Sequence, residues 1–246
     1  WNSISGRAAM FQNDLIHAME AMGFILEERQ VQQFCRFEEM LLETNKVMNL
    51  TAITEPGEVA VKHMADSLSC YDEKYFPEGA SLLDLGTGAG FPGVPLAIFR
   101  PDLTVTFFDS LQKRLNFLRD VCLETGLGQV AFLHGRAEEM AHQEAYRERF
   151  DLVTSRAVAR LSILCEWALP YVRKDGLFIA LKGAQYEEEL KEASNALRIL
   201  GGTLEEVRPV TLPGLSDKRA VLYIRKSGTS PARYPRKPKM AAKHPL

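Results

Sequence analysis

The chain has 246 residues, of which 46% are hydrophobic and 25% are charged, and its formal net charge is −2. This composition is that of a globular protein able to bury a core, and it excludes a largely disordered chain. Because the sequence contains no apolar run of about 18 residues and no signal peptide, we expect a cytoplasmic protein without a membrane partner.

The four cysteines lie in apolar or helical contexts and lack the C-x-x-C spacing of zinc or redox sites. We therefore expect reduced core residues rather than disulfides or metal ligands, and we predict no metal site. They are Cys35, Cys70, Cys122 and Cys165.

Two helices are predicted at the start of the chain, over Phe11–Gly23 and Glu28–Met48. Phe34, Phe37 and Leu41 recur at helical spacing in the second, and we expect this apolar face to pack against the main sheet. We assign residues 1–70 to a helical extension of the core.

A further helix is expected to begin at Pro56, whose missing N–H costs nothing at a helix start. His63 and Asp66 lie three residues apart on it and could share one face. No Ser or Cys nucleophile motif accompanies them, so we interpret them as a surface or capping pair rather than as catalytic residues.

The most informative stretch is Ser81–Asp109, which reads SLLDLGTGAGFPGVPLAIFRPDLTVTFFD. Its pattern predicts a strand, a glycine loop, a helix and a second strand that ends in an acid. Glycines let the backbone approach a ligand, and a helix start presents unpaired N–H groups. Asp109 follows Gly86 by 23 residues, a spacing at which a carboxylate can bind a ribose diol.

The glycine spacing decides between two kinds of nucleoside. A dinucleotide loop needs a third glycine where this chain has Phe91. The spacing found is G-x-G-x-G over Gly86, Gly88 and Gly90, preceded by Asp84, which resembles the loop of S-adenosylmethionine (SAM) methyltransferases. We expect Asp84 to meet the cationic amino group of the methionine moiety, directly or through water, whereas it would repel a pyrophosphate.

After Asp109, predicted strands and helices alternate along the chain. The strands are Gln129–Leu133, Phe150–Thr154, Leu177–Leu181, Thr203–Leu212 and Arg219–Arg225, and the helices are 111–122, 161–172 and 187–200. Such alternation predicts a doubly wound α/β sheet of seven strands over residues 71–226. The short loop before the last strand requires that strand to run antiparallel to its neighbour.

The C-terminal tail, residues 227–246, is rich in Pro, Lys and Arg. From Arg225 to Leu246 there are seven basic residues and no acidic one, which leaves residues 1–224 with 23 basic and 32 acidic groups. The tail is either a solvated disordered end or an arm for RNA. We favour RNA, because Tyr234 lies among basic residues and aromatic and guanidinium planes stack on unpaired bases. The predicted RNA-binding residues are Arg233, Tyr234, Arg236 and Lys237.

Several segments resemble the bacterial 16S rRNA guanine-N7 methyltransferase G family, also called glucose-inhibited division protein B. They are NLTAIT, HMADSL, LLDLGTGAGFPGVPLAI, FFDSLQKRLNFL, GRAEE, SRAVA, LKG and RYPRKPKMAAKHPL, in this order from about Asn45 to the C-terminus. The ending is the most specific of them. This chain departs from the family pattern near Lys239–Ala241 and at His244.

The resemblance implies SAM as cofactor, S-adenosylhomocysteine as product, and 16S rRNA or the small ribosomal subunit as partner. It places Gly86 and Phe91 on SAM, Ala137 and Glu138 at the adenine, and Arg156 at the mouth of the site as the catalytic residue and as a cofactor-binding residue. A structural ion-pair role for Arg156 is the alternative.

The resemblance also implies the acceptor, N7 of a guanine. That atom carries a free lone pair and no proton, so direct in-line transfer needs no general base. The sequence agrees, because it contains no Asp-Pro-Pro-Tyr or Asn-Pro-Pro-Tyr motif and no Pro-Cys pair. Two alternatives stay open: an NAD(P)-dependent oxidoreductase on a related fold, and a non-catalytic SAM-binding ribosome-assembly protein.

Overall fold

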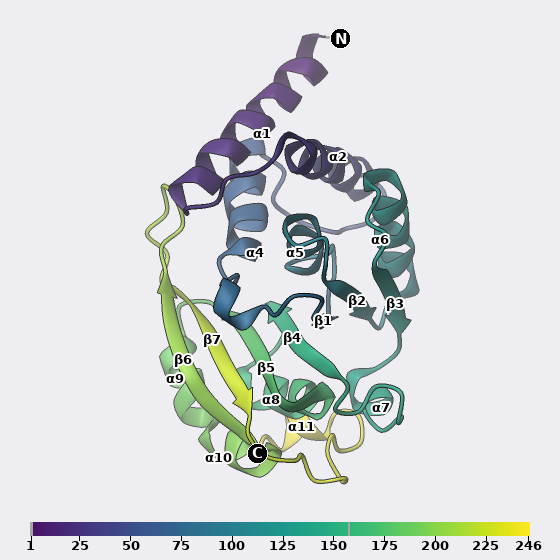
Figure 1. Cartoon of the computed structure of the whole chain (residues 1–246), viewed down its shortest axis with the longest axis vertical. Coiled ribbons are helices and arrows are strands. Elements are labelled where there is room, and N and C mark those ends of the chain that lie inside the picture. The colour runs from purple at the N-terminus through teal and green to yellow at the C-terminus, as the bar shows by residue number, and fades with distance from the viewer. Residues whose placement is uncertain (1, 157) are drawn as a thin grey trace.

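The computed structural model describes residues 2–156 and 158–246. Within these residues seven strands form one sheet in the order β3-β2-β1-β4-β5-β7-β6 (Figure 1). The strands are β1 (Ser81–Leu85), β2 (Thr104–Asp109), β3 (Val130–His134), β4 (Phe150–Arg156), β5 (Val172–Lys182), β6 (Gly202–Val210) and β7 (Arg219–Lys226). β7 runs antiparallel to both β5 and β6, and the other pairs are parallel, as predicted.

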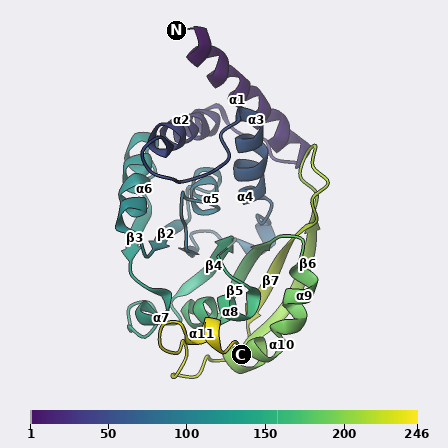
Figure 2. The ribbon, with the colours of Figure 1, turned by 180° about the vertical axis from the view of Figure 1, so that it is seen from behind.

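Helices cover both faces of the sheet (Figures 1 and 2). They are α1 (Asn2–Ala21), α2 (Glu28–Asn45), α3 (Pro56–Glu58), the π-helix η1 (Val59–Ala65), α4 (Asp66–Leu68), η2 (Glu73–Tyr75), α5 (Gly93–Phe99), α6 (Gln112–Thr125), α7 (Ala137–Met140), α8 (Leu161–Ala168), the 3-10 turn η3 (Leu169–Tyr171), α9 (Tyr186–Glu192), α10 (Ser194–Leu200) and α11 (Met240–Lys243). In the described part of the chain, none of these helices is long and apolar enough to cross a membrane.

Two apolar clusters hold the layers together. One joins α1, α2, η1, α5 and α6 to one face of the sheet, and the other joins α8, α9 and α10 to the opposite face. The predicted apolar face of α2 lies in the first cluster, where Phe34, Phe37 and Leu41 are fully buried. The doubly wound fold and the packing of the N-terminal helices are therefore confirmed.

Several element bounds differ from the predictions for local reasons. α1 begins at Asn2 rather than Phe11. α2 ends at Asn45, whose side-chain oxygen accepts the N–H groups of Leu50 and Thr51 and so stabilises a turn there. The helix expected over 161–172 ends at Ala168, and the one expected over 187–200 divides into α9 and α10 at Ala193.

All four cysteines are free, as predicted. Cys70, Cys122 and Cys165 are buried, and Cys35 is half-buried. Burial raises the pKa of the Cys35 thiol to about 11.

Candidate functional site

Asp84, near the end of β1, is wholly buried and organises the glycine loop. Its Oδ2 accepts hydrogen bonds from Thr87 Oγ1 at 2.6 Å and from the Gly93 N–H at 2.9 Å, and its Oδ1 accepts one from Thr154 Oγ1 at 2.8 Å. The carboxylate thus ties β1 to the loop, to the start of α5 and to β4. Burial raises its pKa to about 6, against the opposing effect of these hydrogen bonds.

This geometry gives Asp84 a structural role that the sequence did not predict. The carboxylate has no exposed surface and positions the loop backbone. Its predicted contact with the amino group of a bound methionine moiety, directly or through water, stays a prediction.

The loop backbone matches the predicted cradle. Gly86, Gly88 and Gly90 all have positive φ, a region that favours glycine. Gly93 is required for a different reason, because a Cβ there would lie 2.5 Å from Asp84 Oδ2 and 2.8 Å from Phe107 Cε1. A side chain at this position would push α5 away from the carboxylate that holds it.

Asp109 ends β2 at the predicted place and is 4% exposed. Its Oδ2 accepts the N–H of Gly88 and its Oδ1 accepts the N–H of Leu111, each at 2.9 Å. The carboxylate therefore fixes the glycine loop to the start of α6. It also lines a cleft, so its predicted contact with a ribose diol stays a prediction.

Three adjoining clefts open at the carboxyl edge of the parallel strands. The adenosine-side cleft, about 510 Å³, is lined by the predicted Gly86, Asp109, Ala137 and Glu138 together with Trp167. Leu85 and Phe108 give it apolar walls. Trp167 Nε1 is buried and has no hydrogen-bond partner among the described residues. A cleft that combines apolar walls with the Trp167 N–H and the carboxylates of Asp109 and Glu138 is suited to bind a nucleoside.

The central cleft, about 430 Å³, continues the adenosine-side cleft past Gly86 and Asp109. Gly88, Phe91 and Arg156 line it. The third, cationic cleft, about 530 Å³, shares His63 and Arg156 with the central one and adds Lys62, Lys182, Lys218 and Arg219. The sheet order reverses between β1 and β4, which is where ligands bind in open α/β sheets.

His63, Asp66 and Arg156 meet where the central and cationic clefts join. Arg156 Nη1 donates to Asp66 Oδ2 at 3.0 Å, and Arg156 Nη2 donates to His63 Nδ1 at 3.1 Å. Arg219 Nη1 donates to the other oxygen, Asp66 Oδ1, at 2.8 Å. The interpretation of His63 and Asp66 as a surface or capping pair is therefore wrong: they are 7% and 5% exposed and hold two arginines.

The contacts of His63 define its tautomer. Because Nδ1 accepts from Arg156, Nε2 carries the proton and donates to Thr51 Oγ1 at 2.7 Å. Burial and then the charge of Arg156 lower the pKa of His63 to about 3, so the ring is neutral at pH 7. The ring stacks on Phe91 with 4.4 Å between centroids, and the Arg156 guanidinium lies 4.9 Å above the same Phe91 ring.

Arg156 thus combines both roles that the sequence left open. It is ion-paired, and it also lines the mouth that two clefts share. The predicted catalytic role stays a prediction.

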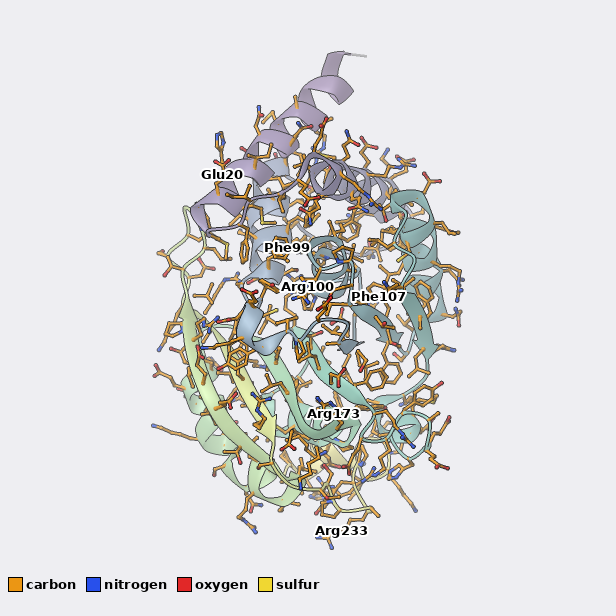
Figure 3. All side chains as sticks on the ribbon, viewed as in Figure 1. Glu20, Phe99, Arg100, Phe107, Arg173 and Arg233 are labelled. Atoms are coloured by element: carbon orange, nitrogen blue, oxygen red, sulfur yellow. The ribbon has the colours of Figure 1, made fainter. Side chains whose placement is uncertain are left out.

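The tail differs from its prediction. Tyr234 is 5% exposed within the second apolar cluster, and Arg236 forms an ion pair with Glu166 at 2.7 Å. The proposed stacking of these two side chains on RNA bases is corrected, because neither is free to stack. Arg233 and Lys237 are exposed, and Figure 3 shows Arg233 at the outer end of the molecule. Their RNA contact stays a prediction.

Sequence reasoning missed three residues that line the clefts: Trp167, Lys182 and Arg219. Lys182 carried a signal, since it ends the buried strand β5 at the edge where ligands bind. Within the described residues no group of three His, Cys, Asp or Glu side chains could hold a metal ion.

Comparison with known proteins identifies close relatives. The family model described as rRNA small subunit methyltransferase G matches residues 30–218. The ribosomal RNA small subunit methyltransferase G of Desulforamulus reducens is 47% identical over 94% of this chain and 97% of its own length. That of Alkaliphilus metalliredigens is 46% identical over 92% of this chain and 95% of its own length.

Solved structures resemble the chain in fold alone. A mutant 16S rRNA (adenine(1408)-N(1))-methyltransferase of Catenulisporales acidiphilia has a TM-score of 0.51 at 15% identity, over 62% of this chain and 87% of that one. A fibrillarin pre-rRNA processing protein of Methanococcus jannaschii has a TM-score of 0.50 at 17% identity, over 67% and 74%.

We predict that Gly93→Ala separates α5 from Asp84 and lowers the free energy of unfolding by about 1–3 kcal/mol, as overpacking does. Urea unfolding measures the loss. Gly128→Ala is the matched control, because a Cβ at Gly128 meets nothing within 4 Å. Equal stability of the two variants would contradict the role given to Gly93.

The pH dependence of stability tests the buried neutral His63. Its pKa is about 3 in the folded chain and near 6.5 when unfolded, so below pH 6.5 the unfolded state binds the proton first. The wild-type chain should therefore lose stability relative to His63→Gln as the pH falls from 6.5 toward 3, by up to about 1.4 kcal/mol per pH unit. Urea unfolding at several pH values gives both curves, and parallel curves would refute the assignment.

Proposed function

The chain belongs to the rRNA small subunit methyltransferase G family, and from this premise we propose that it methylates N7 of a guanine in 16S rRNA by direct in-line transfer. It is a SAM-dependent methyltransferase that acts on small-subunit rRNA. Four points go beyond this statement and are proposals. They are the acceptor atom N7, the mechanism of methyl transfer, the form of the substrate (naked rRNA or assembled subunit) and a cytoplasmic location.

The observation that carries the mechanism is that the candidate bases in contact with Arg156, and those that line the central cleft with it, already accept hydrogen bonds. Both oxygens of Asp66 accept from arginines, and both oxygens of Asp109 accept backbone N–H groups. The Nδ1 lone pair of His63 accepts from Arg156. Among the described residues that line the central cleft, no carboxylate or imidazole is therefore left as a free base, which suits an acceptor atom that has no proton to lose.

Each cleft has a part in this proposal. The adenosine-side cleft would hold the nucleoside of SAM, with Gly86 and Asp109 at its inner end and Ala137, Glu138 and Trp167 around it. Bound SAM supplies an electrophilic methyl group on a positively charged sulfur. The cationic cleft would hold the nucleotide, with Lys182, Lys218 and Arg219 near its phosphates.

Catalysis then comes from positioning, which supplies ~7–11 kcal/mol of a barrier in favourable cases. Arg156 holds the acceptor at the junction, and the apolar Phe91 and Val158 line the central cleft beside it. As the guanine N7 lone pair forms the new carbon–nitrogen bond, the bond from the methyl carbon to sulfur breaks and no proton moves.

We predict that the chain transfers labelled methyl from SAM to small-subunit rRNA isolated without this modification. Chemical cleavage specific for N7-methylguanine then gives the position of the product. Naked 16S rRNA and assembled subunits, tested in parallel, distinguish the two substrates. Label at another atom would contradict N7, and the absence of label would favour the non-catalytic assembly protein.

The role of Arg156 is tested by Arg156→Ala. We expect kcat on rRNA to fall by roughly 100-fold or more, as it does when a preorganised charge is removed, while the Kd for SAM changes little. Arg160→Ala is the matched control, because Arg160 precedes α8 and its exposed guanidinium pairs with Glu192. Near wild-type turnover of Arg156→Ala would contradict a catalytic role and would show that Arg156 has a structural role only.

A further inference from the structure

Residues 227–246, which we call the C-terminal strap, pack against the body of the protein. Ser230 Oγ donates to Leu200 O at 2.7 Å, and Tyr234, Pro235 and Ala241 are buried. Figures 1 and 2 show the strap beside α7 and α8. These are the two helices whose residues wall the adenosine-side cleft.

α7 is poorly able to hold its own position. It has four residues, none of them buried, although it carries Ala137 and Glu138 at the cleft. So short a helix is unstable alone, and tertiary contacts must supply its stability. At its start, Tyr171 Oη donates to Ala137 O at 2.6 Å.

The strap holds the other end of α7 through two side chains. Arg147 Nη1 donates to Ala141 O at 3.2 Å and to Tyr234 O at 2.8 Å, while its Nη2 donates to Ser230 O and Pro231 O. His142 Nε2 donates to Pro235 O at 2.7 Å. The residues that follow α7 are thus hydrogen-bonded directly to the strap.

The strap also holds α8. Glu166 on α8 has a side chain only 1% exposed, and it accepts Arg236 Nη2 at 2.7 Å and the Arg236 backbone N–H at 2.8 Å. A buried carboxylate needs such partners, because taking an unpaired charge out of water costs several kcal/mol. The next residue, Trp167, lines the adenosine-side cleft.

We propose that the C-terminal strap is a positioning element of the cofactor site, in which Arg236 acts through Glu166 on α8 and the strap backbone acts through His142 and Arg147 on α7. The inference rests on the proposed function, in that the adenosine-side cleft binds SAM. It gives the basic strap a purpose other than RNA contact, since the Arg236 guanidinium is committed to Glu166 and to His244 O.

A charge-matched pair of variants tests the proposal. Arg236→Ala and Lys237→Ala each remove one positive charge from the strap, but Lys237 is exposed whereas Arg236 pairs with buried Glu166. We expect Arg236→Ala to raise the Kd for SAM and for S-adenosylhomocysteine roughly tenfold, and Lys237→Ala to leave both unchanged. Arg236→Lys should bind the cofactor better than Arg236→Ala but less tightly than the wild type, because lysine keeps the positive charge but cannot form the bidentate contact with Glu166.

The chain offers its own spectroscopic probe for these titrations. It contains two tryptophans, Trp1 and Trp167, so in a Trp1→Phe background the fluorescence comes from the cleft residue Trp167. Equal affinities in Arg236→Ala and Lys237→Ala would overturn the proposal. So would an equal rise in KM for rRNA and an equal loss of salt dependence in both, which is the result expected of an RNA arm.

A second variant covers the case in which Arg236→Ala does not fold. His142 is exposed, and His142→Ala removes one contact with the strap without leaving a buried charge. In the protein without cofactor we expect faster hydrogen exchange at the Glu139 and Met140 amides, whose bonds to Arg136 O form α7. Unchanged hydrogen exchange at these two amides in His142→Ala would contradict the proposed positioning of α7 by the strap.

The product titrations separate this inference from the proposed function. Tight binding of S-adenosylhomocysteine that depends on Arg236, with no methyl transfer to rRNA, would refute the proposed methyl transfer and support the positioning role of the strap. Methyl transfer to rRNA with cofactor affinities that do not depend on Arg236 would support the proposed function and refute the positioning role of the strap.

Discussion

One buried carboxylate fixes the geometry on which the rest of the site depends. Asp84 has no exposed surface, and an unpaired charge there would cost several kcal/mol. Its hydrogen bonds to Thr87, Gly93 and Thr154 offset that cost and hold the loop, α5 and β4 around it. The charge and the loop conformation therefore stabilise each other.

A second carboxylate, Asp66, joins the N-terminal helices to the carboxyl edge of the parallel strands. It binds Arg156 from the end of β4 and Arg219 from the start of β7. Because β7 is antiparallel, its first residue lies at the edge where β4 ends. The antiparallel strand thus supplies a cation that an all-parallel sheet would place at its opposite edge, and the helical extension becomes a wall of the cationic cleft.

Local sequence patterns predicted the strands, the glycine loop and Asp109, because each depends on neighbours in the chain, whereas Ala137 and Glu138 were implied by the family resemblance. The errors and omissions concern partners far away in sequence. Spacing placed Asp84 near the cofactor but did not say which side of the backbone its carboxylate occupies. His63 and Asp66 looked like a surface pair because Arg156 lies 90 or more residues away. The composition of the strap favoured an RNA arm over a solvated end, whereas buried Glu166 on α8 gives Arg236 a partner within the chain.

The separation of these partners also constrains how the chain folds. Asp66 and Arg219 are 153 residues apart, and Asp84 and Thr154 are 70 apart. Contacts between distant residues form late, because the entropy of closing a long loop is lost before the contact is gained. The cationic cleft is therefore a product of complete folding. A partly folded chain that has formed its glycine loop but not docked β7 lacks Arg219 at this cleft, so the ion pair between Asp66 and Arg219 reports on the integrity of the whole sheet.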